Sequence, residues 1–219
     1  MIVHRFGGGL AVVHTQPAHA QALEELQTIV FPTLAPEQRF RAPHYVKHVE
    51  LFPDGQLCVV EEATGRVAGM TSTIRLDFDF AHPGHTFADV IQGGWLTSHD
   101  PAGRWLYGAD IGTHPDFRRR GIARALYAAR HEVVARFGLA GQVTVGMPSG
   151  YGAVKHELSA EQYYAELLAG EREDPTVSAQ RRVGFELRGL LADYLDDPVC
   201  DGYGVVLVLP AERDVRYPP

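Results

Sequence analysis

Cysteine is scarce in this sequence, with Cys58 and Cys200 the only two among 219 residues. Cys58 lies inside an apolar run and Cys200 in a turn-like stretch, so their placement fits neither a disulfide framework nor a metal site. The eleven histidines are scattered, and His82 and His85 share a loop that holds no further ligand at metal-binding spacing. We therefore expect two free thiols, a reducing compartment and no bound metal.

Long apolar runs and an excess of positive charge are also missing. No apolar run approaches the ~18 residues that a membrane span needs, and Gly7-Gly8-Gly9 interrupts any apolar core of a signal peptide. The net charge of -7 argues against a broad nucleic-acid-binding face, which needs clustered Lys and Arg. We expect a cytoplasmic protein with neither a membrane nor a nucleic acid as partner.

What is present is an ordinary globular composition, with 45% apolar and 21% charged residues, which fits one α/β domain over residues 1–219. Residues 77–104 show no sustained period and predict an ordered loop on the substrate side. Apolar spacing, capping signals and turn residues predict the other elements. Helices are expected over 18–30, 42–51, 121–137, 159–169 and 175–183, and strands over 10–14, 56–61, 66–76, 105–113, 142–147, 185–191 and 204–209.

Three arginines and a glycine, Arg118 to Gly121, stand between the strand predicted over 105–113 and the strongest predicted helix. Unpaired N–H groups and the positive end of the helix dipole meet at such a junction and favour an anion. Gly121 permits close backbone approach or a positive φ, and the small Ala123 leaves room beside the first helical turn. The strand, loop, helix, strand order ending at 142–147 predicts a crossover unit with two neighbouring parallel strands.

The stretch 114–126, HPDFRRRGIARAL, closely resembles the acetyl-coenzyme A pyrophosphate loop of the GNAT superfamily of N-acetyltransferases. The element order fits that fold from residue 10 to residue 209. The resemblance implies an α+β fold: a mixed, largely antiparallel central sheet flanked by helices, with a parallel strand pair splayed around acetyl-CoA, the co-substrate. It further implies two groups of cofactor-binding residues. Ile111, Gly112 and Thr113 would offer main-chain groups to the pantetheine arm and thioester, and Arg118, Arg119, Arg120, Gly121, Ile122 and Ala123 would hold the pyrophosphate.

Ordinary strand core is an equally good interpretation of Ile111 and Thr113. The sequence also departs from the family at one position. Many members carry a tyrosine four residues before a Gly-Phe pair, where its hydroxyl can protonate the departing thiolate, and Gln180 stands there in this chain. Glutamine cannot act as an acid. Tyr151 and Tyr203, in Gly-flanked loops, are candidate substitutes or simply packed loop aromatics.

The acceptor amine must lose a proton before or during its attack on the thioester, because only the neutral amine has a free lone pair. Asp110 is the leading candidate base, since it is the one acidic residue on the strand predicted over 105–113. A structural hydrogen bond is the alternative role for a strand aspartate. His99 and Asp100, in the preceding loop, are the reserve pair.

The predicted activity is N-acetyl transfer from acetyl-CoA to a primary amine of a small molecule or peptide, directly in a ternary complex, since no Cys or Ser stands in a nucleophile arrangement. The departure at Gln180 keeps a non-catalytic acetyl-CoA-binding sensor or interaction module as the alternative. The family also implies a homodimer, and the acyl chain length stays open. Acidic residues crowd the C-terminal third and form either a site for a cationic acceptor or a solvated face: Glu157, Glu161, Glu166, Glu171, Glu173, Asp174, Asp193, Asp196, Asp197 and Asp201.

Overall fold

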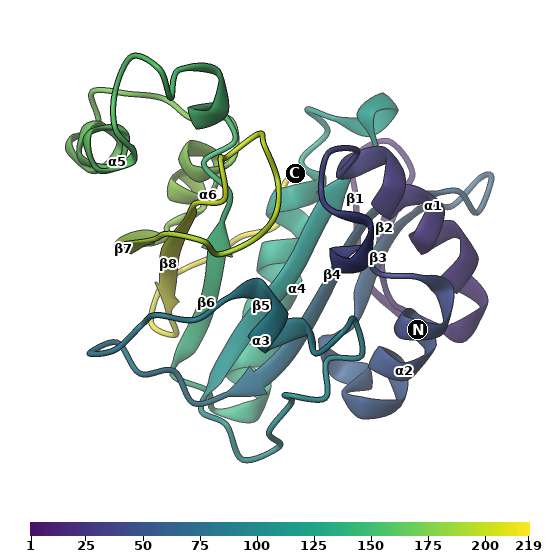
Figure 1. The fold of residues 1–219 in the computed structure, drawn as a ribbon. Coiled ribbons are helices and arrows are strands. Elements are labelled where there is room, and N and C mark those ends of the chain that lie inside the picture. The colour runs from purple at the N-terminus through teal and green to yellow at the C-terminus, as the bar shows by residue number, and fades with distance from the viewer.

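The computed structural model describes residues 1–219 and contains one eight-stranded sheet in the order β1-β2-β3-β4-β5-β6-β8-β7 (Figure 1). Only the β5 and β6 neighbours run parallel, and every other neighbouring pair is antiparallel. The mixed, largely antiparallel sheet predicted from the sequence is therefore confirmed. The strands are β1 Ile2–Phe6, β2 Leu10–His14, β3 Leu57–Glu61, β4 Val67–Leu76, β5 Trp105–Thr113, β6 Gly141–Gly146, β7 Glu186–Leu191 and β8 Gly204–Pro210.

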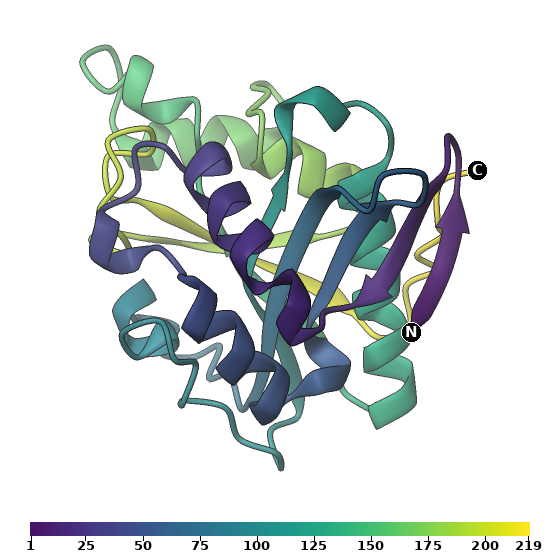
Figure 2. The same ribbon diagram turned by 90° about the vertical axis from the view of Figure 1, so that its right-hand side faces the viewer.

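Helices cover both faces of the sheet, with α1 and α2 on one face and α4 on the other (Figures 1 and 2). The alternation of side chains along β2 explains how: Ala11 and Val13 pack toward α1, while Leu10 and Val12 pack toward α4. None of the helices combines the length and apolar character that a membrane span requires. The helices are α1 Ala20–Val30, α2 Ala42–Leu51, α3 Phe87–Ile91, α4 Ile122–Phe137, α5 Ala160–Ala169 and α6 Val177–Val183.

The α4 helix has the ends that its sequence predicts. Gly121 precedes the helix at φ 79°, and Gly138 ends it at φ 61°, where its N–H reaches the carbonyls of the last turn. Both are left-handed conformations that glycine adopts without a Cβ penalty. The side chains Ala125, Leu126 and Ala129 are buried against β2, β3 and β4, and their small size lets the helix lie close to the sheet.

The two parallel strands separate halfway along their length. β5 and β6 pair from Trp105 with Gly141 to Gly108 with Thr144, and no further. Beyond this point β5 continues to Thr113 paired with β4 alone. The separation coincides with a β-bulge, because Ser72 of β4 pairs with Asp110 and Thr73 with Gly108, which leaves Ala109 without a partner. The predicted splayed pair is confirmed, and the bulge marks where the splay begins.

Two elements are absent from the sequence-based prediction. β1 forms a hairpin with β2 through Gly8 and Gly9, both at positive φ, so these glycines form the turn between two strands. The short α3 helix lies within 77–104 and is capped by Thr86, whose hydroxyl accepts from the Asp89 N–H. At five residues it is too short to show a helical period.

Candidate functional site

A cavity of about 580 Å³ fills the space between the diverging ends of β5 and β6. That volume is in the usual range for a small-molecule site, and half of the lining residues are hydrophobic. Its walls come from seven parts of the chain. They are the end of α1 with the loop after it (27–34), Phe87 of α3, Ala109–Thr113 of β5, the start of α4 with Arg118 before it, the end of β6 with the residues after it (144–149), α6 with the residues before it (175–180), and the loop before β8 (194–199).

The predicted pyrophosphate loop lies at one end of this cavity. Arg118 and Ala123 line it. Arg119 takes a left-handed conformation at φ 61°, which together with Gly121 turns the chain tightly into the helix. Arg120 points elsewhere: its guanidinium donates to the Gly8 carbonyl at 2.9 Å. The first-turn N–H groups of α4 therefore remain the groups best placed for an anion, with Arg118 as the cation beside them.

The absent side chain of Gly121 makes room for the C-terminal segment. A Cβ at this position would lie 2.8 Å from the Pro218 ring. Ile122, the next residue, is buried in the core between α4 and the sheet, so its side chain does not reach the cavity. Figure 2 shows the C-terminal segment beside the β1 hairpin, where Tyr217 stacks on His4 with ring centroids 3.7 Å apart.

Ile111, Gly112 and Thr113 all line the cavity. They belong to the part of β5 that has lost its β6 partner, so main-chain groups on that edge have no strand to pair with. A Cβ on Gly112 would lie 3.0 Å from a Val30 methyl and 3.1 Å from the Met70 methyl. Glycine thus keeps α1 close to the strand at the cavity wall.

Asp110 is buried at the cavity wall, 8% exposed, and it is the most unusual polar group there. Its Oδ1 accepts the Ser72 main-chain N–H at 2.5 Å, while its Oδ2 is buried and has no hydrogen-bond partner. Burial raises the pKa of this carboxyl to about 6, against the opposing effects of Ser72, the Arg130 charge and the nearby Tyr45 hydroxyl. The structure therefore holds a carboxyl that is costly to ionise and that has one oxygen without a hydrogen-bond partner.

Arg130 supports this arrangement from α4. It is 1% exposed, and its guanidinium donates to the Thr71 hydroxyl and to the main-chain carbonyl of Asp110. Burial lowers the pKa of Arg130, and the nearby Tyr127 and Asp110 raise it. Its partners fix the β4 and β5 segments around the aspartate, so the buried guanidinium holds the bulge as well as balancing charge.

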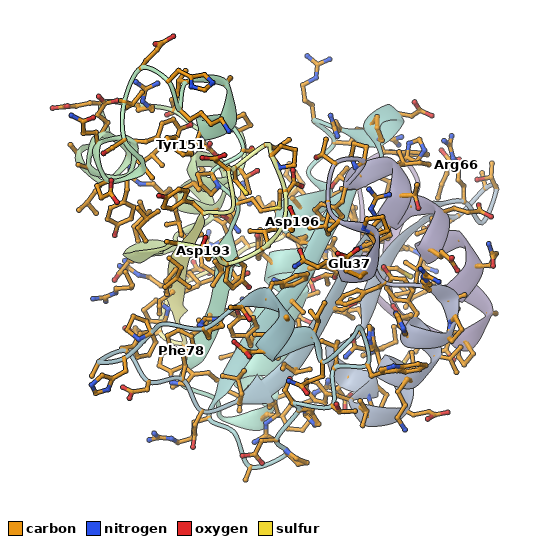
Figure 3. The ribbon with its side chains drawn as sticks, viewed as in Figure 1. Glu37, Arg66, Phe78, Tyr151, Asp193 and Asp196 are labelled. Atoms are coloured by element: carbon orange, nitrogen blue, oxygen red, sulfur yellow. The ribbon has the colours of Figure 1, made fainter.

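The other predicted catalytic residues lie outside the cavity. Tyr151 packs against the rings of Tyr163 and Tyr203, and Figure 3 shows Tyr151 in the part of the molecule that holds α5. His99 accepts the Arg75 main-chain N–H through Nδ1 at 3.0 Å, and Asp100 is exposed in a turn. Of the predicted catalytic and reserve residues, only Asp110 lines the cavity.

Gln180 does line the cavity, and its amide donates to the Tyr127 hydroxyl at 2.9 Å. Tyr127 comes from α4, is 3% exposed, and has a pKa raised by burial. Tyr127 does not stand out in the sequence, because a tyrosine counts as one more apolar residue on a strong amphipathic helix. Only its hydroxyl, on a different face of α4 from the sheet-facing Ala125 and Ala129, could have indicated a role in the site.

Two further cavity residues, Tyr194 and Asp197, come from the loop before β8. Tyr194 is 4% exposed, and its hydroxyl lies 2.9 Å from that of Tyr107. Asp197 is 2% exposed and accepts the Val199 N–H through Oδ1 at 2.9 Å. Asp197 is the only member of the acidic C-terminal group that lines the cavity, so most of that group does not contact the site.

The loop that carries Tyr194 contacts the segment after α1 across the cavity. The Ala35 N–H donates to the Asp196 carbonyl at 3.0 Å, and the Asp196 N–H donates to Gln38 at 2.9 Å. Figure 3 shows Asp196 and Glu37 near each other at this contact, with Asp193 farther along the same loop. The contact joins the segment after α1 to the loop before β8 and forms one side of the entrance.

Comparisons with known proteins agree with this geometry. Residues 20–154 match the acetyltransferase (GNAT) family. Two Bacillus subtilis proteins are similar: "Uncharacterized N-acetyltransferase YkwB", 29% identical over 85% of this chain and 82% of its own length, and "Probable hydrolase YhcX", 30% identical over 88% of this chain. This chain spans only 37% of the length of YhcX.

Solved structures show the same fold. The "GphF GNAT-like decarboxylase in complex with isobutyryl-CoA" is 21% identical with a TM-score of 0.74, and the match covers 92% of this chain and 99% of GphF. YncA from Salmonella typhimurium, a putative acetyltransferase with its cofactor acetyl-CoA, is 12% identical with a TM-score of 0.55, over 96% and 99% of the two chains. At these identities the likeness shows the fold alone, and both relatives bind a CoA thioester.

Proposed function

This chain belongs to the acetyltransferase (GNAT) family, and from that premise we propose that it moves an acetyl group from acetyl-CoA to a primary amine by direct attack in a ternary complex. The observation that carries the proposal is the buried carboxyl of Asp110, a residue that lines the cavity between the splayed strands and whose Oδ2 has no hydrogen-bond partner. A base at the wall of a substrate cavity suits the deprotonation of an attacking nucleophile.

The coenzyme would enter from the α4 end of the cavity. The first-turn N–H groups of α4 and the Arg118 side chain would hold the pyrophosphate. The pantetheine arm would then lie between β5 and β6, where the free edge of Ile111–Thr113 supplies main-chain groups in place of the missing strand. When bound, acetyl-CoA supplies the activated acetyl group, and the protein supplies position and proton transfer.

Two side chains would transfer protons during the acetyl-transfer step, one as the base and one as the acid. As the C–N bond forms, the attacking nitrogen loses a proton to Asp110 Oδ2. As the C–S bond breaks, the thiolate takes a proton from the Tyr127 hydroxyl, which accepts from Gln180 and so keeps its own hydrogen to donate. The proton held by Asp110 later replaces the one that Tyr127 gave, so both groups return to their starting state.

Decarboxylation of a carboxyacyl-CoA is a second candidate, because the fold is closer to the GphF decarboxylase than to YncA, with TM-scores of 0.74 and 0.55. A decarboxylase must accept a carboxylate into the cavity. Here the two acidic side chains in the lining are Asp110 and Asp197, and Arg118 at the coenzyme end is the only Lys, Arg or His in it. Like charges in a poorly solvated site repel, so this lining favours an amine over a carboxylate.

Thiol release from acetyl-CoA with a panel of amines tests the proposal. The panel contains a polyamine, an aminoglycoside, a lysine peptide and a peptide with a free N-terminus. We expect release with at least one amine, and a fall in kcat of about 10²-fold or more in Asp110→Asn with the Kd of acetyl-CoA unchanged. Tight binding without release would favour a non-catalytic module. Carbon dioxide release from methylmalonyl-CoA without an amine would favour decarboxylation, and absence of coenzyme binding would refute all three.

A further inference from the structure

The proposed transfer leaves one proton to be removed from the cavity. An alkyl amine arrives as R–NH₃⁺, and its conversion with acetyl-CoA into an amide and a free thiol releases one net H⁺. Asp110 gains one proton and Tyr127 loses one in the transfer step, and both return to their starting state, so they do not account for this proton. Because bound coenzyme and acceptor would occupy the entrance of the cavity, its walls should contain a path for the proton.

A chain of three hydrogen-bonding groups leads from the cavity wall to the loop before β5. The Tyr194 hydroxyl lies 2.9 Å from the Tyr107 hydroxyl. The Tyr107 hydroxyl in turn lies 2.8 Å from Nε2 of His85. Tyr194 lines the cavity, Tyr107 is fully buried on β5, and His85 is half-buried. The chain therefore connects the site to a ring that water can reach.

The direction of the hydrogen bonds follows from the outer end. Nδ1 of His85 lies 2.7 Å from the Pro83 carbonyl oxygen, which can only accept, so Nδ1 carries the hydrogen of the neutral ring. Nε2 then has a lone pair and accepts from Tyr107. The Tyr107 oxygen is left to accept from Tyr194, and the Tyr194 oxygen keeps a lone pair for the cavity. Every donor points outward, as a proton leaving the site requires.

We propose that the acceptor ammonium loses its first proton through Tyr194, Tyr107 and His85. The N–H bond of the ammonium breaks, and the proton joins the Tyr194 oxygen as the hydrogen of Tyr194 moves to Tyr107 and that of Tyr107 moves to Nε2. His85 becomes an imidazolium and gives a proton to water, and exchange with water and rotation of the hydroxyls restore the first arrangement. Both tyrosines stay neutral throughout, which agrees with the raised pKa that burial gives each of them.

The side chains around Tyr194, Tyr107 and His85 fit a role in proton transfer. The Phe78 ring stacks on Tyr107 with centroids 6.3 Å apart and meets His85 edge-on at 5.6 Å. Phe87 lies against Tyr194 at 5.9 Å. These rings screen the hydroxyls from water, and Figure 3 shows Phe78 on the loop that approaches from the side away from α5. A path without side exits directs the proton along the hydroxyls.

Charged and titratable groups near His85 are few. Tyr107 contacts it from β5, and the Tyr194 ring lies 5.5 Å from it. The Asp89 carboxylate is close enough for His85 to help lower the Asp89 pKa, after the larger effect of the Thr86 hydrogen bonds. Asp89 is therefore the carboxylate beside the outer end of the relay.

The relay rests on the proposed function. Comparing two acceptor amines distinguishes a failure of the relay from a failure of the acetyltransferase activity. An alkyl amine is protonated at pH 7.5, whereas an aromatic amine is already neutral and has no net proton to export. We expect Tyr107→Phe and His85→Gln to lower kcat/KM for the alkyl amine by about 10²-fold, with little change for the aromatic amine and an unchanged KM for acetyl-CoA. Tyr164→Phe, on α5 and outside the cavity, is the matched control and should behave as the native protein with both acceptors.

The outcomes are distinct. A native protein that binds acetyl-CoA but acetylates neither amine would remove the proposed function and the relay together. Acetylation of both amines, with each variant slowing both equally or neither, would overturn the relay alone. The half-buried His85 tolerates replacement better than the buried Tyr107, so His85→Gln gives the result if Tyr107→Phe fails to fold.

Discussion

Asp110 shows how a single residue acquires its chemistry from its surroundings. The sequence identifies it as the one acidic side chain on its strand, but a strand aspartate faces either side of a sheet. Pairing with Ser72 at the bulge orients its Oδ1 toward that N–H and leaves Oδ2 free. Burial then raises the pKa to about 6, because water no longer solvates the charged form.

The pH dependence of the reaction should report this carboxyl. With an aromatic amine that stays neutral across the range, we expect kcat/KM to rise with pH through about 6, since the ionised Asp110 is the form that accepts a proton. Asp110→Asn should lack this acidic limb and retain about 10⁻² to 10⁻⁴ of the activity. Rates measured between pH 5 and pH 9 check this. The same limb in the Asn variant would show that another group is the base.

Ionisation of Asp110 should lower the stability of the folded protein, although it raises the activity. Its folded pKa of about 6 lies above the ordinary value of 3.8, so the folded state binds the proton more tightly than the unfolded chain does. Asp110 therefore costs little stability below pH 4 and its full penalty above pH 6. The asparagine variant should accordingly gain stability relative to the native protein as the pH rises between these limits, which urea unfolding at pH 4 and pH 8 would measure.

At the scale of one element, α4 connects coenzyme and core. Its N-terminal end provides the free N–H groups, and its buried face packs on β2, β3 and β4. Two reasons were expected for a glycine at 121, close approach of a phosphate or a positive φ. The structure shows the positive φ, 79°, and adds that the space for a Cβ is filled by Pro218. Gly121 therefore fixes the start of the helix instead of opening a hole beside it.

Replacing the glycines at the two ends of α4 tests this explanation. Gly121→Ala and Gly138→Ala both place alanine at positive φ, so each should cost about 1 kcal/mol of folding stability. A Cβ on Gly138 meets nothing within 4 Å, whereas one on Gly121 collides with Pro218 and displaces the start of the helix. Only Gly121→Ala should weaken acetyl-CoA binding, by about tenfold or more. Calorimetric titration would measure this, and equal affinities in the two variants would contradict it.

At the scale of the whole molecule, the site exists only where several distant parts meet. The cavity takes walls from both helical layers, from the split in the sheet and from the loop before β8. The sheet joins these parts, since hydrogen-bonded neighbours run without a break from β1 to β7. We propose on this basis that residues 1–219 unfold as one cooperative unit, and that a ligand in the cavity stabilises all of it.

Thermal unfolding with ligand tests that proposal. Acetyl-CoA at 100 times its Kd should add about 2.7 kcal/mol to the free energy of unfolding. For a chain of this size the unfolding midpoint should rise by about 5–10 °C, in a single transition. S-acetyl pantetheine lacks the diphosphate and serves as the control, with a smaller rise expected at the same concentration. Equal shifts would mean that the start of α4 does not bind the diphosphate, and two transitions would mean two domains.

The sequence by itself determined the order of elements around the site, because periodicity, capping and turn residues act over a few positions. β2, α2 and β5 begin and end where the pattern predicted, and the Arg118 to Gly121 junction identified the family. The elements it missed, β1 and α3, are five residues each and leave too little pattern to detect.

Only the tertiary structure decided which polar groups meet inside the cavity. Tyr107 and Tyr194 are 87 positions apart, and Tyr127 and Gln180 are 53 apart. Such contacts depend on strand register, on the bulge at Ala109 and on how two loops close over the sheet, none of which a local pattern encodes. The same dependence put Asp110 in the cavity wall and left Tyr151 outside it, although both carry suitable chemistry.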